Sequence, residues 1–195
     1  MNTKNTLLQT LILTAVATAA HATTFVAMDE RTLARTADAI VVGTIERIES
    51  VASSDARIDT LVTVAVAEHY KGDVGSEIVL KQPGGSVDGR GMWIAGSPTF
   101  TVGERDLLFL SAARDGTART TAFGMGQFRV GSDTVGGDAA ALRALTERVV
   151  GGSQVRKLKL SRLLRTIRRA VAAGGQASAP LLAVPREMTA PGVAR

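Results

Sequence analysis

The sequence predicts a mainly β protein of the α+β class, built as a small antiparallel barrel or sandwich. Five or six short apolar runs alternate with glycine-rich or polar turns along residues 39–130. Runs of this length and spacing are typical of small all-β architectures. A short helix is expected before the strands, and helices are expected after them.

The first elements expected along the chain are a helix over residues 28–37 and a strand over residues 39–48. Met28, Leu33 and Ala37 can share the apolar side of that helix, and two acidic residues stand near its start, where the helix dipole favours negative charge. A glycine inside a strand is typical of a bulge or of a close approach between backbones. Gly43, in the middle of the strand, therefore predicts one of these two features.

The remaining strands are marked by apolar residues and by the turns between them. Val62, Val64 and Val66 occupy every second position, which predicts a strand with one strongly apolar face over residues 60–68. Glycine-bearing segments at 71–76, 83–85 and 113–117 predict turns. Further strands are expected at residues 77–82, 92–95, 107–111, 118–122 and 126–130.

Three charged residues, Glu104-Arg105-Asp106, stand directly before the apolar run 107–110. A strand that is apolar on both faces must enter the core from a polar turn. In an extended chain, Glu104 and Asp106 share one side and Arg105 points to the other. We interpret these residues as a solvent-exposed turn that leads into a buried strand. The alternative is a pair of carboxylates that divides acid and base roles around a substrate.

Residues 1–22 have the features of a secretory signal peptide. Lys4 lies in a short polar start, an apolar run covers residues 7–20, and Ala20-His21-Ala22 fits an A-x-A cleavage site. The run is shorter than the roughly 20 apolar residues that a membrane-spanning helix needs. We expect cleavage near Ala22/Thr23 and export of the protein to a periplasm or to the extracellular space.

The chain contains no cysteine and two histidines, of which His21 would leave with the signal peptide. A multi-histidine or thiolate metal site is therefore excluded within one chain, and we expect no metal and no cofactor. His69 falls at the end of a predicted strand, and no orienting partner can be identified from the spacing. We interpret it as a partly exposed strand-end residue rather than a general base.

Three glycine-rich segments match catalytic or nucleotide-binding motifs only in part. In residues 84–88, GGSVD, Asp88 occupies the last glycine position of the nucleophile elbow G-x-S-x-G. Residues 89–91 and 124–126 begin like a dinucleotide fingerprint, but Ile94 and Arg129 stand at its third glycine position. We expect a loop at residues 84–88, no phosphate site at the other two places, and no catalytic residue.

The charge of the chain is distributed unevenly. Residues 23–150 carry 17 acidic and 13 basic side chains, whereas residues 151–195 carry nine basic and one acidic. After an amphipathic segment at 139–150 and a hinge at 151–152, the sequence predicts a basic amphipathic helix that has Ser161 as its N-cap and ends at 174–175. The apolar stripe of this helix comprises Leu160, Leu163, Leu164, Ile167 and Val171, and the residues off the stripe include Arg162, Arg165, Arg168 and Arg169.

Three roles are open for this helix. Its stripe could pack on the acidic body, it could lie on an anionic membrane or envelope surface, or it could enter the groove of a partner. The four arginines are candidate interaction residues for the second and third roles. Trp93, beside a glycine-rich loop, is a further candidate ligand contact, and its alternative role is packing. Nucleic acid is not expected as a partner, because export removes most of it and stacking aromatics are few.

Residues 28–130 resemble a group of secreted bacterial proteins of uncharacterised function. The resemblance is carried by ADAIVVGTI at 37–45, VAEHYKG at 66–72, PGG at 83–85, GSPTFTVGERDLLFL at 96–110 and GQFRV at 126–130. The order of an apolar strand after AD, a long strand ending in KG and another apolar strand is similar to the netrin-type domain of tissue inhibitors of metalloproteinases. This similarity implies an OB-like barrel of five strands. It does not imply inhibition, because those inhibitors use an amino-terminal cysteine and this mature chain would begin Thr23-Thr24.

The sequence therefore predicts a signal peptide at 1–22, an OB-like β-barrel domain of five to six strands at 23–135, a helical segment at 136–174 and a flexible tail at 175–195. We expect an exported, non-enzymatic binding or structural module with an unidentified protein or envelope partner. One alternative is a protease-inhibitor-like protein. The other is a hydrolase that uses carboxylates near Asp88, Glu104 and Asp106, which a raised pKa in a shared cleft would favour.

Overall fold

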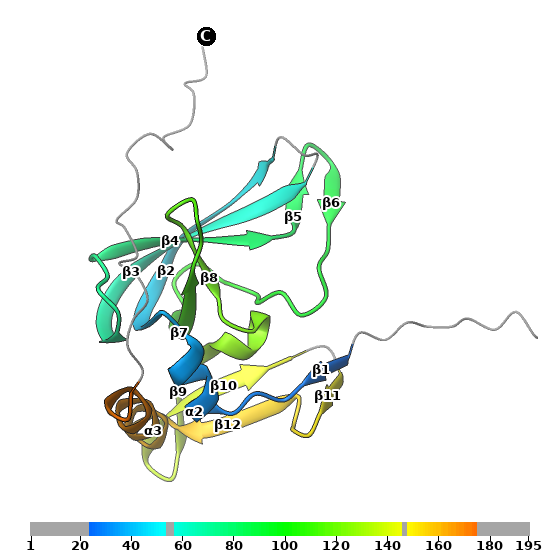
Figure 1. Ribbon diagram of the computed structural model, residues 1–195. Coiled ribbons are helices and arrows are strands. Elements are labelled where there is room, and N and C mark those ends of the chain that lie inside the picture. Colours follow the sequence, from blue (N-terminus) through cyan, green and yellow to red (C-terminus); the bar gives the residue numbers. More distant parts are fainter. Residues whose placement is uncertain (1–23, 54–56, 146–147, 175–195) are drawn as a thin grey trace, which may run out of the picture.

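The computed structural model describes residues 24–53, 57–145 and 148–174, and this part of the chain is mainly β (Figure 1). The predicted signal peptide and the predicted tail lie outside the described residues. Neither helix of the described part has the length and apolar character needed to cross a bilayer.

Eight strands form one continuous sheet. They are β2 (Ala39–Ala52), β3 (Ile58–Lys71), β4 (Glu77–Pro83), β7 (Arg105–Ala112), β8 (Ala118–Thr120), β9 (Gln127–Val135), β10 (Asp138–Ala144) and β12 (Val155–Lys159). Their order is β12-β10-β9-β7-β2-β3-β4-β8, and β8 also pairs with β7. Five strands, β7, β2, β3, β4 and β8, therefore close into a barrel. This confirms the predicted mainly β class and a five-stranded barrel, with β4 and β8 as a parallel pair in an otherwise antiparallel sheet.

Two smaller sheets lie beside this one. The hairpin of β5 (Gly85–Val87) and β6 (Arg90–Met92) projects at one end of the molecule, and β1 (Thr24–Val26) pairs in parallel with β11 (Arg148–Val150) toward the other end (Figure 1). A short 3-10 helix, η1 (Phe123–Gly126), leads into β9. The strand expected at 92–95 ends at Met92, so that prediction is wrong for most of its length.

The sheet divides at β7. The beginning of this strand pairs with β9 and its end pairs with β8, while its other edge pairs with β2 along most of its length. On one side of this division the barrel closes, and on the other β9, β10 and β12 continue as an open extension that we call the wing.

Both faces of β2 at residues 39–42 and of β7 at residues 107–110 are buried, each face in a different core. Side chains on one face fill the barrel and form the barrel core, which includes Ala39, Val41, Leu108 and Leu110. Side chains on the other face form the wing core, which includes Ile40, Val42, Leu107 and Phe109. This arrangement explains why residues 39–42 and 107–110 are apolar at every position, because a strand covered on both faces has no polar face to present.

Two helices cover the wing core. In α2 (Glu30–Thr36), the N-cap Asp29 accepts a hydrogen bond at Oδ1 from the Thr32 amide at 2.6 Å, and this helix lies within the predicted range 28–37. In α3 (Leu160–Ala172), Leu163 and Ile167 are fully buried in the wing core. The two helices lie side by side against the wing (Figure 1).

The end of β3 fixes the end of α2. The Lys71 ammonium donates hydrogen bonds to the carbonyls of Ala34 at 3.1 Å and Arg35 at 2.9 Å. These carbonyls belong to the last turn of the helix, where the dipole favours a cation. Burial lowers the pKa of Lys71, with Asp38 opposing this effect. The barrel and the helical layer are thereby joined by a charged side chain as well as by the shared core.

The helical segment predicted for residues 136–174 is wrong before residue 160, where β10, β11 and β12 are found instead. Asp138–Ala144 pairs with β9 on one edge and with β12 on the other. Ladder hydrogen bonds on both edges override the high helix propensity of its alanines. The predicted N-cap is also wrong: α3 begins at Leu160, and the Ser161 amide donates to Asp138 Oδ2 at 3.3 Å.

The bulge or close approach predicted at Gly43 is confirmed. The register between β2 and β3 shifts between Val42 and Gly43, and a Cβ on Gly43 would lie 2.5 Å from the Ala65 carbonyl oxygen.

We expect Gly43→Ala to lower the free energy of unfolding by about 2 kcal/mol, because backbone and packed side chains would have to move. Urea unfolding of the mature protein measures this change.

Gly91→Ala is the matched control. Gly91 lies in β6, where nothing is found within 4 Å of an added Cβ, so its stability should change by less than about 0.5 kcal/mol. Equal stability of the two variants would contradict the close approach at Gly43.

Candidate functional site

The four candidate arginines lie on the solvent side of α3. Arg162, Arg165, Arg168 and Arg169 are all exposed, whereas Leu163, Ile167 and Ala170 are buried. The rest of the apolar stripe, Leu160, Leu164 and Val171, packs at the margin of the wing core. The stripe therefore packs on the body of the protein, and the arginines face away from it. We call these four side chains the arginine face.

Among the described residues, no carboxylate lies within ion-pair distance of the arginine face. One of its members contacts an aromatic ring: the guanidinium carbon of Arg168 lies 5.4 Å from the centroid of Tyr70. The Tyr70 hydroxyl donates to Glu68, and Glu68 also accepts from Arg105 Nη2 at 2.9 Å. Burial and the nearby Glu68 raise the pKa of Tyr70 to about 12. The arginine face is thus connected to the barrel through β3, and no ion pair with a described carboxylate compensates its charge.

Trp93 is 77% exposed, so the interpretation that it packs in the core is wrong. It follows β6 and lines a cavity of about 240 Å³ together with Met92, Ile94, Pro98 and Phe100. Several polar groups around this cavity are already paired, as Thr60 Oγ1 donates to the Gly84 carbonyl at 2.7 Å. The cavity is therefore largely apolar. It lies at the β5–β6 end of the molecule, away from α3 (Figure 1).

The structure brings together only two of the three candidate carboxylates. Asp88 turns the β5–β6 hairpin and is exposed, and this hairpin pairs with neither β7 nor β9. Glu104 and Asp106 share one side of the chain, as predicted, and face β9. Arg105 points the other way, toward Glu68. The three carboxylates therefore do not line one cleft.

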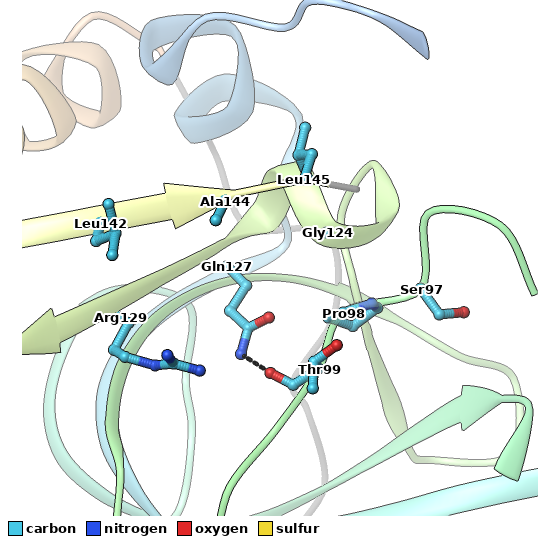
Figure 2. A pocket seen from close by; sticks show the side chains of 9 residues that line it. All are labelled: Ser97, Pro98, Thr99, Gly124, Gln127, Arg129, Leu142, Ala144 and Leu145. Atoms are coloured by element: carbon cyan, nitrogen blue, oxygen red, sulfur yellow. Dashed lines mark hydrogen bonds between the residues drawn. The ribbon is translucent and has the colours of Figure 1, made fainter. Parts of the chain in front are cut away.

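Asp106 is fully buried, which corrects the interpretation that it belongs to a wet turn. Gln127 Nε2 donates to Asp106 Oδ2 at 2.7 Å and to the Thr99 carbonyl at 2.8 Å, and Figure 2 shows the second of these bonds. Asp106 Oδ1 has no hydrogen-bond partner in the part of the chain that the structure describes. Burial raises the pKa of Asp106 to about 6, while Gln127 and Arg129 act in the opposite direction.

Glu104 is held by Arg129, whose Nε lies 2.8 Å from Glu104 Oε2. Arg129 and Gln127 line a cavity of about 90 Å³ together with residues 97–99 (Figure 2). This volume is well below the roughly 300 Å³ of a typical small-molecule site and suits a few waters. Gln127 was missed in the sequence, although its i, i+2 spacing from Arg129 places both on one face of the strand.

His69 is exposed in β3, opposite Val41 of β2, in agreement with the strand-end interpretation. The loop expected at residues 84–88 is wrong for residues 85–87, which form β5. A turn follows this strand, so the segment is not a strand-to-helix elbow. Within the described ranges, no group of three or more histidine, cysteine or acidic residues could hold a metal ion.

The chain matches no protein-family model, and no match was found among curated proteins. Function must therefore be inferred from the side chains and their surroundings, since a barrel of this kind serves many purposes.

Asp106 gives a test of the site's electrostatics. Its folded pKa of about 6 lies above its ordinary value of 3.8, so the folded state binds a proton more tightly than the unfolded chain. Its contribution to stability therefore becomes more favourable as the pH falls from about 6 to about 4. We expect Asp106→Asn to raise the free energy of unfolding at pH 7 by up to about 3 kcal/mol, since each pKa unit corresponds to about 1.4 kcal/mol.

Urea unfolding between pH 4 and pH 8 measures the difference in free energy of unfolding between Asp106→Asn and the natural protein. This difference should shrink toward zero at pH 4. A variant that is less stable at pH 7, with a pH-independent difference, would show that the Asp106 carboxylate stabilises the fold. Asp88→Asn is the control, because Asp88 is exposed and its substitution should leave stability nearly unchanged.

Proposed function

We propose that this protein is an exported, non-enzymatic binding module that associates with anionic bilayer surfaces of the cell envelope through the arginine face of α3. The observation that carries the proposal is the arrangement of α3 itself. Its apolar stripe is used in the wing core, while four arginines stand in solvent without carboxylate partners among the described residues. Export is inferred from the signal-peptide features of residues 1–22.

The burial of the stripe determines the kind of contact. An amphipathic helix that lies in a membrane interface must insert its apolar face, but Leu163 and Ile167 are already in the wing core. The proposed contact is therefore peripheral and electrostatic. A basic residue near an anionic membrane surface contributes about 1 kcal/mol. Four arginines then give about 4 kcal/mol, which corresponds to a Kd of about 1 mM, so the association is weak and reversible.

A lipid surface is favoured over a protein groove by the chemistry of this face. Protein interfaces concentrate apolar and aromatic residues in their centres and are depleted of charge there. The arginine face has no exposed apolar centre, and Tyr70, the ring beside it, is contacted by Arg168. Arginine is suited to phosphate groups because its planar guanidinium can donate two parallel hydrogen bonds.

The carboxylates support a binding role over hydrolysis. Asp106 is fully buried, Glu104 is paired with Arg129, and Asp88 lies on a separate hairpin. A glycosidase-like mechanism needs two carboxyl groups that flank a substrate. Considered alone, the raised pKa of Asp106 favours the hydrolase alternative. However, the cavity lined by its partner Gln127 is too small to admit a typical substrate.

We also infer that the barrel is OB-like and related in fold to the netrin-type domains. Support comes from its strand order, in which a meander of β2, β3 and β4 is closed by β7 and β8, with β4 and β8 in parallel. The inhibitor alternative receives no such support, because the amino-terminal cysteine of that family is lacking. The likeness extends in this proposal to the fold alone.

Co-sedimentation of the mature protein with vesicles tests the proposal. We expect binding to phosphatidylcholine vesicles that contain phosphatidylglycerol, little binding to phosphatidylcholine alone, and loss of binding as salt screens the charges. Replacing all four arginines of the arginine face by glutamine should weaken binding at least tenfold. Each lost contact contributes about 1 kcal/mol, and 1.4 kcal/mol corresponds to a factor of ten.

A matched control replaces four scattered exposed arginines, Arg47, Arg90, Arg114 and Arg119, by glutamine. This control variant loses the same net charge as the arginine-face variant and should keep most of the vesicle binding. Equal loss in both variants would show a non-specific charge effect and contradict the proposal. A blue shift in the emission of Trp93, the single tryptophan, on adding vesicles would instead place the contact at the β5–β6 end.

A further inference from the structure

Among the residues that the structure describes, Arg143 is a buried cation without a counter-ion of its own. It lies in β10, is only 3% exposed, and its guanidinium carbon lies 5.2 Å from the centre of the Phe128 ring. Its Nη1 donates one long hydrogen bond, at 3.5 Å, to the Met125 carbonyl, and its Nε has no hydrogen-bond partner within the described ranges. A guanidinium has five N–H donors, and a buried donor without an acceptor is strongly unfavourable.

The carboxylate that acts on the charge of Arg143, Glu30, is already engaged. Glu30, at the start of α2, accepts from Arg156 Nη2 at 3.1 Å, and its other oxygen lies 2.7 Å from Arg156 Nε. Burial lowers the pKa of Arg143, Glu30 opposes this effect, and Arg156 adds to it. Glu30 is therefore shared between two arginines and satisfies the geometry of only one. One positive charge at this place is therefore unmatched by the described carboxylates.

Arg143 and Arg156 line a cavity of about 470 Å³. The other walls are the segment 26–29 before α2, Thr32 of α2 and the Gly151-Gly152 turn before β12, so β1, α2, β10 and β12 meet around it (Figure 1). The volume lies in the range of small-ligand sites. A cavity with a few convergent polar groups is the usual form of such a site, and here the convergent groups are guanidinium donors.

Asp29 limits the charge of a ligand that could enter. Its carboxylate also lines the cavity, and it caps α2 by accepting from the Thr32 amide at 2.6 Å. It would repel a multiply charged anion, whereas a single carboxylate could still pair with Arg143. Arginine and carboxylate form two parallel hydrogen bonds in their preferred geometry.

We propose that this cavity binds a carboxylate-bearing ligand, either a small free acid or the carboxyl terminus of a peptide, with Arg143 as the residue that pairs with it. This site is distinct from the arginine face and does not depend on the envelope-binding function. Arg156 and the Gly151-Gly152 turn form the rim through which the ligand enters.

Thermal unfolding of the mature protein at constant ionic strength tests the proposal, since a ligand that binds only the folded state raises the Tm. The probes are acetate, a short peptide with a free carboxyl terminus, the same peptide amidated, inorganic phosphate, and chloride as the reference. We expect acetate or the free peptide to raise the Tm by several degrees and the amidated peptide to have no effect. Stabilisation by acetate alone identifies a free acid as the ligand, and stabilisation mainly by the free peptide identifies a peptide terminus. Equal effects of all probes and chloride, or a stronger effect of phosphate, would overturn the carboxylate site.

Arg143→Met removes the charge at similar length. We expect its Tm without ligand to equal or exceed that of the natural protein, because an unmatched buried charge is gone, and the carboxylate effect to be lost. A purely structural Arg143 would behave in the opposite way, with a lower Tm and an undiminished carboxylate effect. Arg119→Gln, at an exposed position on β8, should retain the full effect.

A measurement on the natural protein covers the case in which Arg143→Met fails to fold. In a ¹⁵N NMR titration with the stabilising probe, the Arg143 Nε–H signal and the amides of Gly151 and Gly152 should shift together. If the signals of α3 shift and these three signals do not, the carboxylate binds at the arginine face, and the proposed site is overturned.

Discussion

The pairing of β2 with β7 is the interaction on which the rest of the structure depends. These two strands are apolar at consecutive positions, so one set of side chains fills the barrel and the other set forms the floor of the wing core. Neither strand could leave one face in water without exposing several large apolar residues. The two cores thus require each other, and α2 and α3 are held in place because the second face must be covered.

The surfaces on which the two proposals rest follow from this constraint. Because α3 covers the wing core with its apolar stripe, the opposite side of the helix can only present arginines to solvent. Because β7 pairs with β9 as well as β2, Asp106 is drawn into the sheet and loses its water, with Gln127 as its main compensation. The extension of the sheet into the wing also places Arg143 beneath the segment that enters α2. Barrel closure by itself would have produced none of these three features.

Much of the barrel could be predicted from the sequence, because β2, β3, β4 and β7 each carry a local signal: consecutive apolar residues, valines at alternate positions, or turns rich in glycine. The orientation of the arginines could also be predicted, since helical periodicity alone separates them from the stripe. The strands between residues 138 and 159 could not, because the alanines of β10 favour a helix locally and only the pairing with β9 and β12 reverses this. The burial of Asp106 and of Arg143 likewise depends on partners distant in sequence, and the exposure of Trp93 depends on where β6 ends.

The most direct test of the central claim, that α3 remains packed on the wing core while its arginines contact the bilayer, is amide hydrogen exchange in α3 with and without anionic vesicles. The account predicts strong protection of the amides around Leu163 and Ile167 in the free protein, comparable to that of β7, and no loss of this protection when vesicles bind. Rapid exchange in the free protein, or exposure of Leu107 and Phe109 in β7 on vesicle binding, would show that α3 leaves the core to insert its stripe, and would contradict the account.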